Sequence, residues 1–335
     1  MLRGRGRDCP RMTIGELRDR LESRQVLIYF AAVGIGVIVA MLVSGTERLE
    51  PAVNPALALM LFVTFLQVPI ASLRKAFRNG RFFGALLAVN FVAVPVLVAI
   101  IIQFAPADPL IRLGVLLVLL CPCIDYVVTF SHLGRGDARL LLAATPVLLI
   151  AQMLLLPLWL GLLLGTDAAG LANAEPFLHA FVWLIAIPLA LVVLCQLWAS
   201  RSSAGARATE ILGILPVPAT AVVLFIVIAA VVPQLSPALT AVIGVAPLYI
   251  VFAAIAPLVG WTVARISRLD AAAGRAVAFS GATRNSLVVL PLALAVPGAI
   301  PLLPAVIVTQ TLVELVASLV YIRVMPRLGA KDDRV

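Results

Sequence analysis

Charged residues are scarce in this 335-residue sequence, and so are the residue types that build most catalytic and metal sites. Asp, Glu, Lys and Arg make up 12% of the chain, whereas a soluble protein has about 25%. The two histidines and four cysteines show neither metal-finger spacing nor a disulfide framework. The motifs H-E-x-x-H and G-x-S-x-G and the P-loop are also absent. We therefore expect no enzyme, no resident metal and no cofactor.

Long apolar runs are abundant instead. Hydrophobic residues form 63% of the chain, and the mean hydropathy is +1.13. A spanning helix needs about 20 apolar residues, and long runs without alternation favour helices over a barrel. We predict an all-α polytopic membrane protein with ten transmembrane helices. The expected spans are Val26 to Val43, Asn54 to Leu73, Phe82 to Phe104, Ile111 to His132, Arg139 to Leu164, Pro176 to Trp198, Ile211 to Val232, Leu239 to Ile266, Ala271 to Ala295 and Pro301 to Val324.

The basic residues predict the orientation. Of the 25 Lys and Arg residues, 22 lie before the first span, after the last one or in every second connection between them. The positive-inside rule then places both termini in the cytoplasm. We expect the protein to lie in the plasma membrane. The net charge of +9 needs no nucleic-acid partner. Residues 1–25 are charged and resemble no cleavable signal, and Thr13 with Glu16 forms a capping-box pattern that predicts a short surface helix there.

The chain divides into two halves of five spans. Residues 165–175 form a polar linker between a first half at 26–165 and a second half at 176–325, and residues 326–335 form a cytoplasmic tail. A unit with an odd number of spans inserts its second copy upside down, which gives the inverted repeats common among secondary transporters. The fourth and ninth spans then correspond by position.

Three ionisable residues lie well inside apolar spans, namely Asp125, Arg284 and Glu314. A charge near the bilayer centre costs at least about 2.5–3.5 kcal/mol, so such residues face a cavity or one another. Asp125 and Arg284 occupy corresponding spans and are natural partners. Their pair is either a salt bridge that locks two crossing helices or part of a substrate or proton site.

Both corresponding spans also carry signs of a broken helix. Pro122 removes a backbone donor in the fourth span. In the ninth span Gly281 precedes the small and polar residues Thr283, Asn285 and Ser286. Broken helices expose amides and carbonyls that bind ions or polar solutes in mid-membrane. We therefore expect helices four and nine to be interrupted and to cross.

At these residues the sequence resembles the bile acid:sodium symporter superfamily, and within it the arsenical resistance permeases. The segments that carry the resemblance are PCIDYVVTFSHLGRGDARL, ATRNSLVVLPLALA and QTLVELVASLVYI. It implies ten spans in two inverted repeats, with a core of spans three to five and eight to ten that moves against a panel of spans one, two, six and seven. Cys123, Asn285 and Glu314 match residues of the permease pattern, whereas Leu287 replaces its acidic residue.

The sodium-coupled branch of that superfamily is matched less well. Val127 and Val128 stand where it carries polar side chains, and Ser280 and Arg284 replace its glutamate and glutamine. The guanidinium of Arg284 would oppose a sodium ion in the same cavity. Asn90, in the third span, does match an amide ligand of that branch.

The sequence thus predicts a secondary transporter that exports arsenite or antimonite by alternating access. A thiolate binds thiophilic metalloids, so Cys123 would select the substrate. Asp125 and Arg284 would form a gate, with Asn285 and Ser286 beside the substrate. The candidates for coupling a proton or another ion are Glu314, Asp125 and Asn90, and the helix breaks are assigned to Pro122 and Gly281.

Two alternatives stay open at this point. An organic-anion symporter coupled to sodium or protons would pair its anionic solute with Arg284. An intramembrane thiol oxidoreductase would use Cys121 and Cys123, although C-x-C around a proline differs from the redox C-x-x-C pattern. In the transporter readings the partners are a small solute and the lipid bilayer, and the oligomeric state is open.

Overall fold

The computed structural model describes residues 13–67, 79–124, 126–164, 182–234, 238–294, 296 and 302–329. Within these ranges the regular structure is helical, and the one extended pairing is an antiparallel bridge between Pro122 and Arg284. Six of the described helices are long and apolar enough to cross a membrane, or seven if α11 (Ser203–Leu212) and α12 (Pro216–Val231), which meet at 43°, form one bent span. The chain is a multi-pass helical membrane protein.

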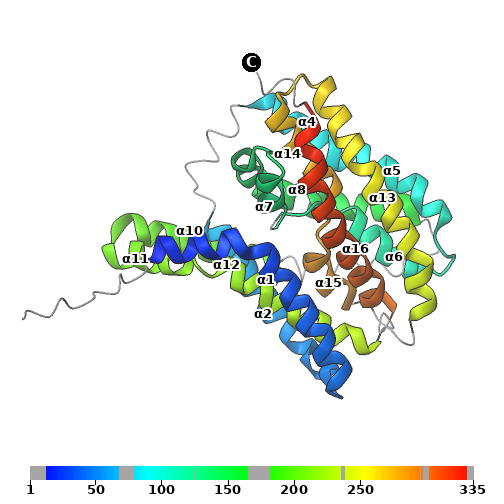
Figure 1. Ribbon diagram of the computed structural model, residues 1–335, viewed down its shortest axis with the longest axis horizontal. Coiled ribbons are helices and arrows are strands. Elements are labelled where there is room, and N and C mark those ends of the chain that lie inside the picture. The colour runs from blue at the N-terminus through cyan, green and yellow to red at the C-terminus, as the bar shows by residue number, and fades with distance from the viewer. Residues whose placement is uncertain are drawn as a thin grey trace, which may run out of the picture.

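Four helices form a layer on one side of the molecule (Figure 1), which we call the panel. Its members are α1 (Ile14–Leu42), α2 (Glu50–Leu66), α10 (Ile187–Arg201) and α12 (Pro216–Val231). Helix α2 packs against α10 and α12, and α12 also packs along α1. Short elements join or extend them, namely η1 (Thr46–Leu49), η5 (Val182–Ala186), α11 (Ser203–Leu212) and η6 (Val232–Gln234).

The other helices gather on the opposite side in a second group (Figure 1), which we call the core bundle. Its first members are α4 (Gly80–Ala88), η2 (Val89–Ala93), α5 (Val94–Ile101), η3 (Ile102–Phe104), α6 (Pro109–Leu119), α7 (Val127–Leu133) and α8 (Ala138–Leu164). Its later members are α13 (Leu239–Ile266), α14 (Ala271–Ala282), α15 (Ser286–Leu294), α16 (Leu302–Val324) and η7 (Met325–Arg327). The panel and the core bundle contain the spans that the resemblance assigns to each.

The first span differs from its prediction. Thr13 caps α1, since its backbone N–H donates to Glu16 Oε2 at 2.9 Å and its hydroxyl accepts from Glu16 N at 3.3 Å. The helix then continues to Leu42, so the surface helix expected within residues 1–25 and the first span are one element. No proline lies between residues 14 and 42, and Leu, Arg and Glu favour a helix. No residue in this stretch therefore interrupts the helix before the apolar span.

The fourth and ninth spans explain why fewer continuous helices appear than spans were predicted. The fourth consists of α6 and α7 with residues 120–126 between them, and the ninth of α14 and α15 with residues 283–285 between them. Each half is too short to cross a bilayer alone. The predicted linker at 165–175 and the start of the sixth span lie outside the described residues, so the count of ten spans stays a prediction.

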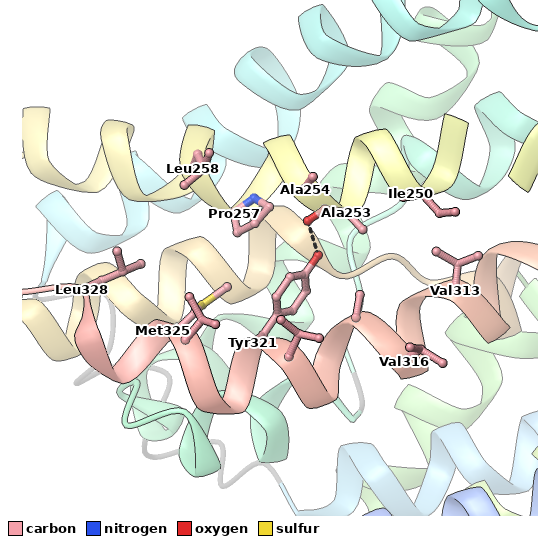
Figure 2. Close-up of a pocket in the computed structure, with 13 residues that line it drawn as sticks. Ile250, Ala253, Ala254, Pro257, Leu258, Val313, Val316, Tyr321, Met325 and Leu328 are labelled. Carbon is pink, nitrogen blue, oxygen red and sulfur yellow. Dashed lines mark hydrogen bonds between the residues drawn. The ribbon is translucent and has the colours of Figure 1, made fainter. Parts of the chain in front are cut away.

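An apolar groove of about 400 Å³ lies between α13 and α16 (Figure 2). Ile250, Leu258, Val316 and Val320 line it and are each more than half exposed. In a membrane protein such side chains face lipid tails. The groove is therefore part of the lipid-facing surface and offers little to a polar solute.

One hydrogen bond joins the two helices that form this groove. Pro257 has no N–H, so the carbonyl of Ala253 one turn earlier loses its helical donor. The hydroxyl of Tyr321 donates to that carbonyl at 2.5 Å (Figure 2). Because lipid offers no substitute donor, this bond links α16 to α13 and satisfies the carbonyl at once.

Replacing this tyrosine should weaken the packing of α16 on α13. Tyr321→Phe leaves the Ala253 carbonyl without a donor, and we expect the free energy of unfolding to fall by about 0.6–2 kcal/mol. Tyr249→Phe is the matched control, because the Tyr249 hydroxyl is buried and has no hydrogen-bond partner among the described residues. Chemical unfolding in detergent micelles measures both, and equal effects would contradict the assignment.

Candidate functional site

The two interrupted helices cross through their backbones. Cys123 N donates to Thr283 O at 3.1 Å, and Asn285 N donates to Cys121 O at 2.8 Å. The two segments run antiparallel, with Pro122 opposite Arg284. We call this pairing the crossing. The helix breaks thus free backbone groups, and some of these groups satisfy each other across the crossing.

The two helix breaks lie at or close to their predicted positions. Pro122 lies inside the first break, as expected, because α6 ends at Leu119 and α7 begins at Val127. Gly281, the residue assigned to the second break, lies in the last turn of α14. The extended residues there are Thr283 to Asn285, with φ and ψ of −107° and 139° at Thr283.

Glu314 on α16 is bonded to both interrupted helices. Its carboxylate accepts hydrogen bonds from the Tyr126 hydroxyl at 2.7 Å, from Arg284 N at 2.6 Å and from Gln310 Nε2 at 2.5 Å. The side chain is 2% exposed. Three donors on one buried carboxylate make it the polar centre that connects α16 to the crossing.

The guanidinium of Arg284 is fully buried among oxygen atoms. Nη2 donates to Asn90 Oδ1 at 3.0 Å and to the carbonyls of Ser280 and Gly281 at 2.6 and 2.8 Å. Nη1 donates to the carbonyl of Leu119 at 3.4 Å, and Nε has no partner among the described residues. These bonds hold the cation at the ends of α14 and α6.

The expected partner of Arg284 was Asp125. Asp125 lies outside the described residues, so this pair and the gate built on it stay predictions. Among the described residues, the carboxylate that contacts Arg284 is that of Glu314, and it accepts from the backbone N–H rather than from the guanidinium.

The other predicted site residues are close to the crossing but are engaged with protein groups. Asn285 Oδ1 accepts from Val288 N at 3.2 Å and caps α15. The Ser286 hydroxyl accepts from the Thr311 hydroxyl at 2.8 Å. Cys121 and Cys123 are not joined in a disulfide and have no exposed surface. Of these four residues, none lines the cleft described next.

A polar cleft of about 160 Å³ separates the panel from the crossing. One wall comes from α1, α2, the residue after α2, and α12, and the other comes from the first break, α7 and α8. The polar side chains on the panel wall are Arg18, Glu22, Gln25, Tyr29, Thr64, Gln67 and Thr220. On the core wall, Ile124 and Tyr126 line the cleft on either side of position 125, together with Thr129.

Sequence reasoning missed these cleft residues, and Gln310 beside Glu314, because it searched the spans for charges. Neutral polar residues inside apolar runs carry the same signal at lower strength. Thr64 lies within the second span, Thr220 within the seventh, and Gln310 lies four residues before Glu314 on one face of a helix. Such residues face a cavity or a partner more often than lipid, so they could have been selected.

The comparison with known proteins bears on the first part of this site. No curated protein sequence matches the chain. The family model described as "Sodium Bile acid symporter family" matches residues 54–241, which is more than half of the chain and runs from α2 into α13. The match includes the first break and both walls of the cleft except for α1, and it agrees with the superfamily resemblance without distinguishing the arsenical branch. The chain, with its panel, its core bundle and its interrupted helix, therefore belongs to the sodium bile acid symporter family.

Proposed function

We propose that the protein is a secondary transporter that moves a small polar organic solute, with anions preferred, across the plasma membrane. The observation that carries this proposal is the polar cleft between the panel and the crossing. Transporters bind solutes beside interrupted helices near the bilayer midplane, where unpaired backbone groups are available. The family description, which names symporters, supports the same class of function.

The proposed fold is that of two inverted halves with ten spans. The halves are residues 26–165 and 176–325. The interruptions fall in the fourth span of each half, and the extended segments pair antiparallel. Two copies of one unit that are inserted in opposite directions would present their breaks in this way.

The cleft has an open end near the start of α1, where Arg18 Nε and Glu22 Oε1 lie 2.6 Å apart with side chains 45% and 41% exposed. The charge distribution of the loops places this end in the cytoplasm. The described conformation is then open to the cytoplasm. Alternating access requires the panel to shift against the core bundle, closing this end and opening the other.

The cleft also limits the chemistry of the solute. Amides of Gln25 and Gln67 and hydroxyls of Thr64, Thr129 and Thr220 donate or accept hydrogen bonds without adding charge. The charge of Arg18 at the open end is balanced by its ion pair with Glu22, so the preference for an anion rests on the family description, which names a bile acid. This set suits carboxylate-bearing organic solutes.

The proposal is tested with inverted membrane vesicles, which expose the cytoplasmic face. Uptake of a radiolabelled bile acid, of a smaller monocarboxylate and of arsenite is compared under separately imposed proton and sodium gradients. Dependence on the proton gradient supports Glu314 as the proton carrier. Uptake of none of the three above that of vesicles lacking the protein would overturn the proposal.

Filling the cleft should block transport. Thr129→Trp places an indole ring in a cleft of about 160 Å³, and we expect uptake to fall about tenfold or more, equivalent to ~1.4 kcal/mol. Val316→Trp is the matched control, because Val316 faces the lipid-exposed groove and is 59% exposed. Equal uptake by the two variants would show that the solute does not pass through the cleft.

Arsenite or antimonite export is the second candidate, favoured by the thiols on both sides of Pro122 at the crossing. Cys123 is adjacent to Ile124, which lines the cleft, so a small shift of the first break would bring its thiol to the solute. Soft metalloids bind thiolates strongly. In the described conformation, however, the Cys123 side chain has no exposed surface.

A serine substitution separates the two candidates. If the thiol binds the metalloid, Cys123→Ser should lower arsenite export about tenfold or more, because an alcohol is a poor ligand for soft centres. Cys195→Ser, in α10 of the panel, serves as the control and should export normally. Arsenite retained in cells measures both variants, and unchanged export by Cys123→Ser would exclude the thiol from the mechanism.

A further inference from the structure

Three backbone carbonyls around Arg284 have lost their helical donors. In an α-helix each carbonyl accepts from the N–H four residues later. In a continuous helix, the carbonyls of Ser280, Gly281 and Leu119 would accept from the N–H groups of residues 284, 285 and 123, respectively. These donate instead to Glu314 Oε2, to Cys121 O and to Thr283 O. The crossing thus leaves these three carbonyls unpaired, and all three accept from the Arg284 guanidinium.

The three carbonyls belong to the C-terminal ends of two helices. Leu119 is the last residue of α6, and Ser280 and Gly281 lie in the last turn of α14. A helix C-terminus carries partial negative charge and favours a cation. Two such ends that converge in a membrane interior would be costly without a positive charge between them, because no water can satisfy their carbonyls.

A side chain completes the oxygen cage. Asn90 lies on the π-helical turn η2, and its Nδ2 donates to Leu86 O at 3.0 Å and to Ser280 Oγ at 2.9 Å. Its Oδ1 is therefore directed at Arg284 Nη2, 3.0 Å away. The Phe252 ring, 5.6 Å from the guanidinium carbon, adds the attraction of an aromatic face for a cation.

The described ligands of the guanidinium are thus four neutral oxygens, a type of donor that also binds hard monovalent cations. Unwound carbonyls and half-helix C-termini are the groups with which transporters bind Na⁺. We propose that the Arg284 guanidinium is a tethered cation that permanently fills a monovalent-cation site, so that this site takes no Na⁺ in the native protein. Shortening the side chain vacates the cage and turns it into a Na⁺ site.

This inference stands on the geometry of the cage and needs no assumption about the solute. It gives the crossing a fixed positive charge throughout the transport cycle, whereas a bound Na⁺ would arrive and leave. Coupling to Na⁺, if it occurs, must then use another site. The guanidinium of Arg284 therefore stabilises the crossing as a fixed cation.

The test measures the melting temperature of the purified full-length protein in detergent, with Na⁺ replaced stepwise by choline at constant ionic strength. The wild type should gain less stability from Na⁺ than the variants with a vacated cage, because the guanidinium already fills that site. Arg284→Ala and Arg284→Gln should melt at lower temperature in choline and gain about 3 °C or more when Na⁺ saturates the cage. Arg284→Lys keeps a cation on the chain and should show a smaller Na⁺ response than Arg284→Ala.

Arg275→Ala is the matched control. Arg275 is also buried, at 2% exposure, and its guanidinium donates to the carbonyls of Leu328 and Arg135, away from the crossing. Its removal should lower stability without any dependence on Na⁺. Because melting needs no transported solute, this readout is independent of the proposed function.

Each other outcome overturns the inference. Equal stabilisation of the wild type and of Arg284→Ala by Na⁺ would show that vacating the cage creates no Na⁺ site. Arg284→Ala and Arg284→Gln that remain folded but do not respond to Na⁺ would show that the vacated cage binds no cation. Failure of both variants to fold in Na⁺ as well as in choline would contradict it too, since Na⁺ should refill the cage.

Discussion

Replacing Glu314 with leucine should abolish transport and destabilise the protein by at least about 3 kcal/mol. The carboxylate accepts from Tyr126, Arg284 and Gln310, and it ties α16 to both interrupted helices. Leucine has a similar size and offers no acceptor. The Arg284 backbone N–H at the centre of the crossing and the Gln310 amide would then lose this acceptor, and the Tyr126 hydroxyl would keep its 3.4 Å contact with Arg284 O.

The size of this effect depends on three bonds that meet at one charged group. A single hydrogen bond between membrane helices contributes only about 0.6 kcal/mol on average. Tyr126→Phe removes one donor and leaves the carboxylate with two, so its cost should be close to that figure. Glu314→Leu should exceed three times this cost, because bonds to a charged acceptor are stronger than neutral ones.

A neighbour on the same helix provides the control. Thr309 is 6% exposed, and its hydroxyl donates to the carbonyl of Ala305 within α16, so it joins no other element. Thr309→Val should change stability little. Melting temperature and vesicle uptake are measured together for all three variants. Glu314→Leu with wild-type stability would show that the carboxylate does not hold the crossing.

The sequence indicated where the helices are interrupted and which charged residues are buried, but it did not indicate the hydrogen bonds between them. A proline in one apolar run and small polar residues in the corresponding run indicated two interruptions, and the structure has interruptions there. Glu314 and Arg284 were selected because charges are rare in membrane spans, and both are buried at the crossing. These predictions depended only on residue type and on the position of each span.

The partners of those charges could not be predicted in the same way. A search for opposite charges paired Arg284 with Asp125, which lies outside the described residues, so that pair stays a prediction. The described partners of the guanidinium are three carbonyls and one amide oxygen, which the search did not consider. A backbone carbonyl is present at every position of a sequence. Which carbonyls are free depends on where the helices end and which N–H groups the partner segment takes, and only the folded structure determines that.

Asn285 and Ser286 make protein contacts that the sequence analysis did not consider. Both were expected beside the solute, because polar side chains follow the break. In the structure Asn285 caps α15 and Ser286 bonds to Thr311 on α16. Asparagine directly before an apolar run is also a helix-cap signal, so the sequence permitted this interpretation from the start.

A single methyl group at Gly260 should destabilise the core bundle. A Cβ at this position would lie 2.8 Å from the Cα of Ala278 and 3.1 Å from the carbonyl oxygen of Val277. Both atoms belong to the backbone of α14, which cannot rotate away as a side chain can. We expect Gly260→Ala to lower the free energy of unfolding by about 1–3 kcal/mol.

The effect on transport follows from what α14 carries. Gly281 faces Gly260 across the contact of the two helices, since a Cβ at Gly281 would lie 3.6 Å from the Cα of Gly260. The carbonyls of Ser280 and Gly281 bind Arg284 from the same turn. Displacing α14 from α13 therefore moves part of the oxygen cage, and uptake should fall along with stability.

Gly84→Ala in α4 is a matched control, because it should change stability in the opposite direction. A Cβ there would meet no atom within 4 Å, and the position lies inside a helix. Alanine is favoured over glycine in a helix by about 0.5–1 kcal/mol, so Gly84→Ala should raise stability slightly. Melting temperatures of the two variants in one detergent test the contrast. A change of the same sign in both would mean that the close approach of α13 and α14 does not constrain the crossing.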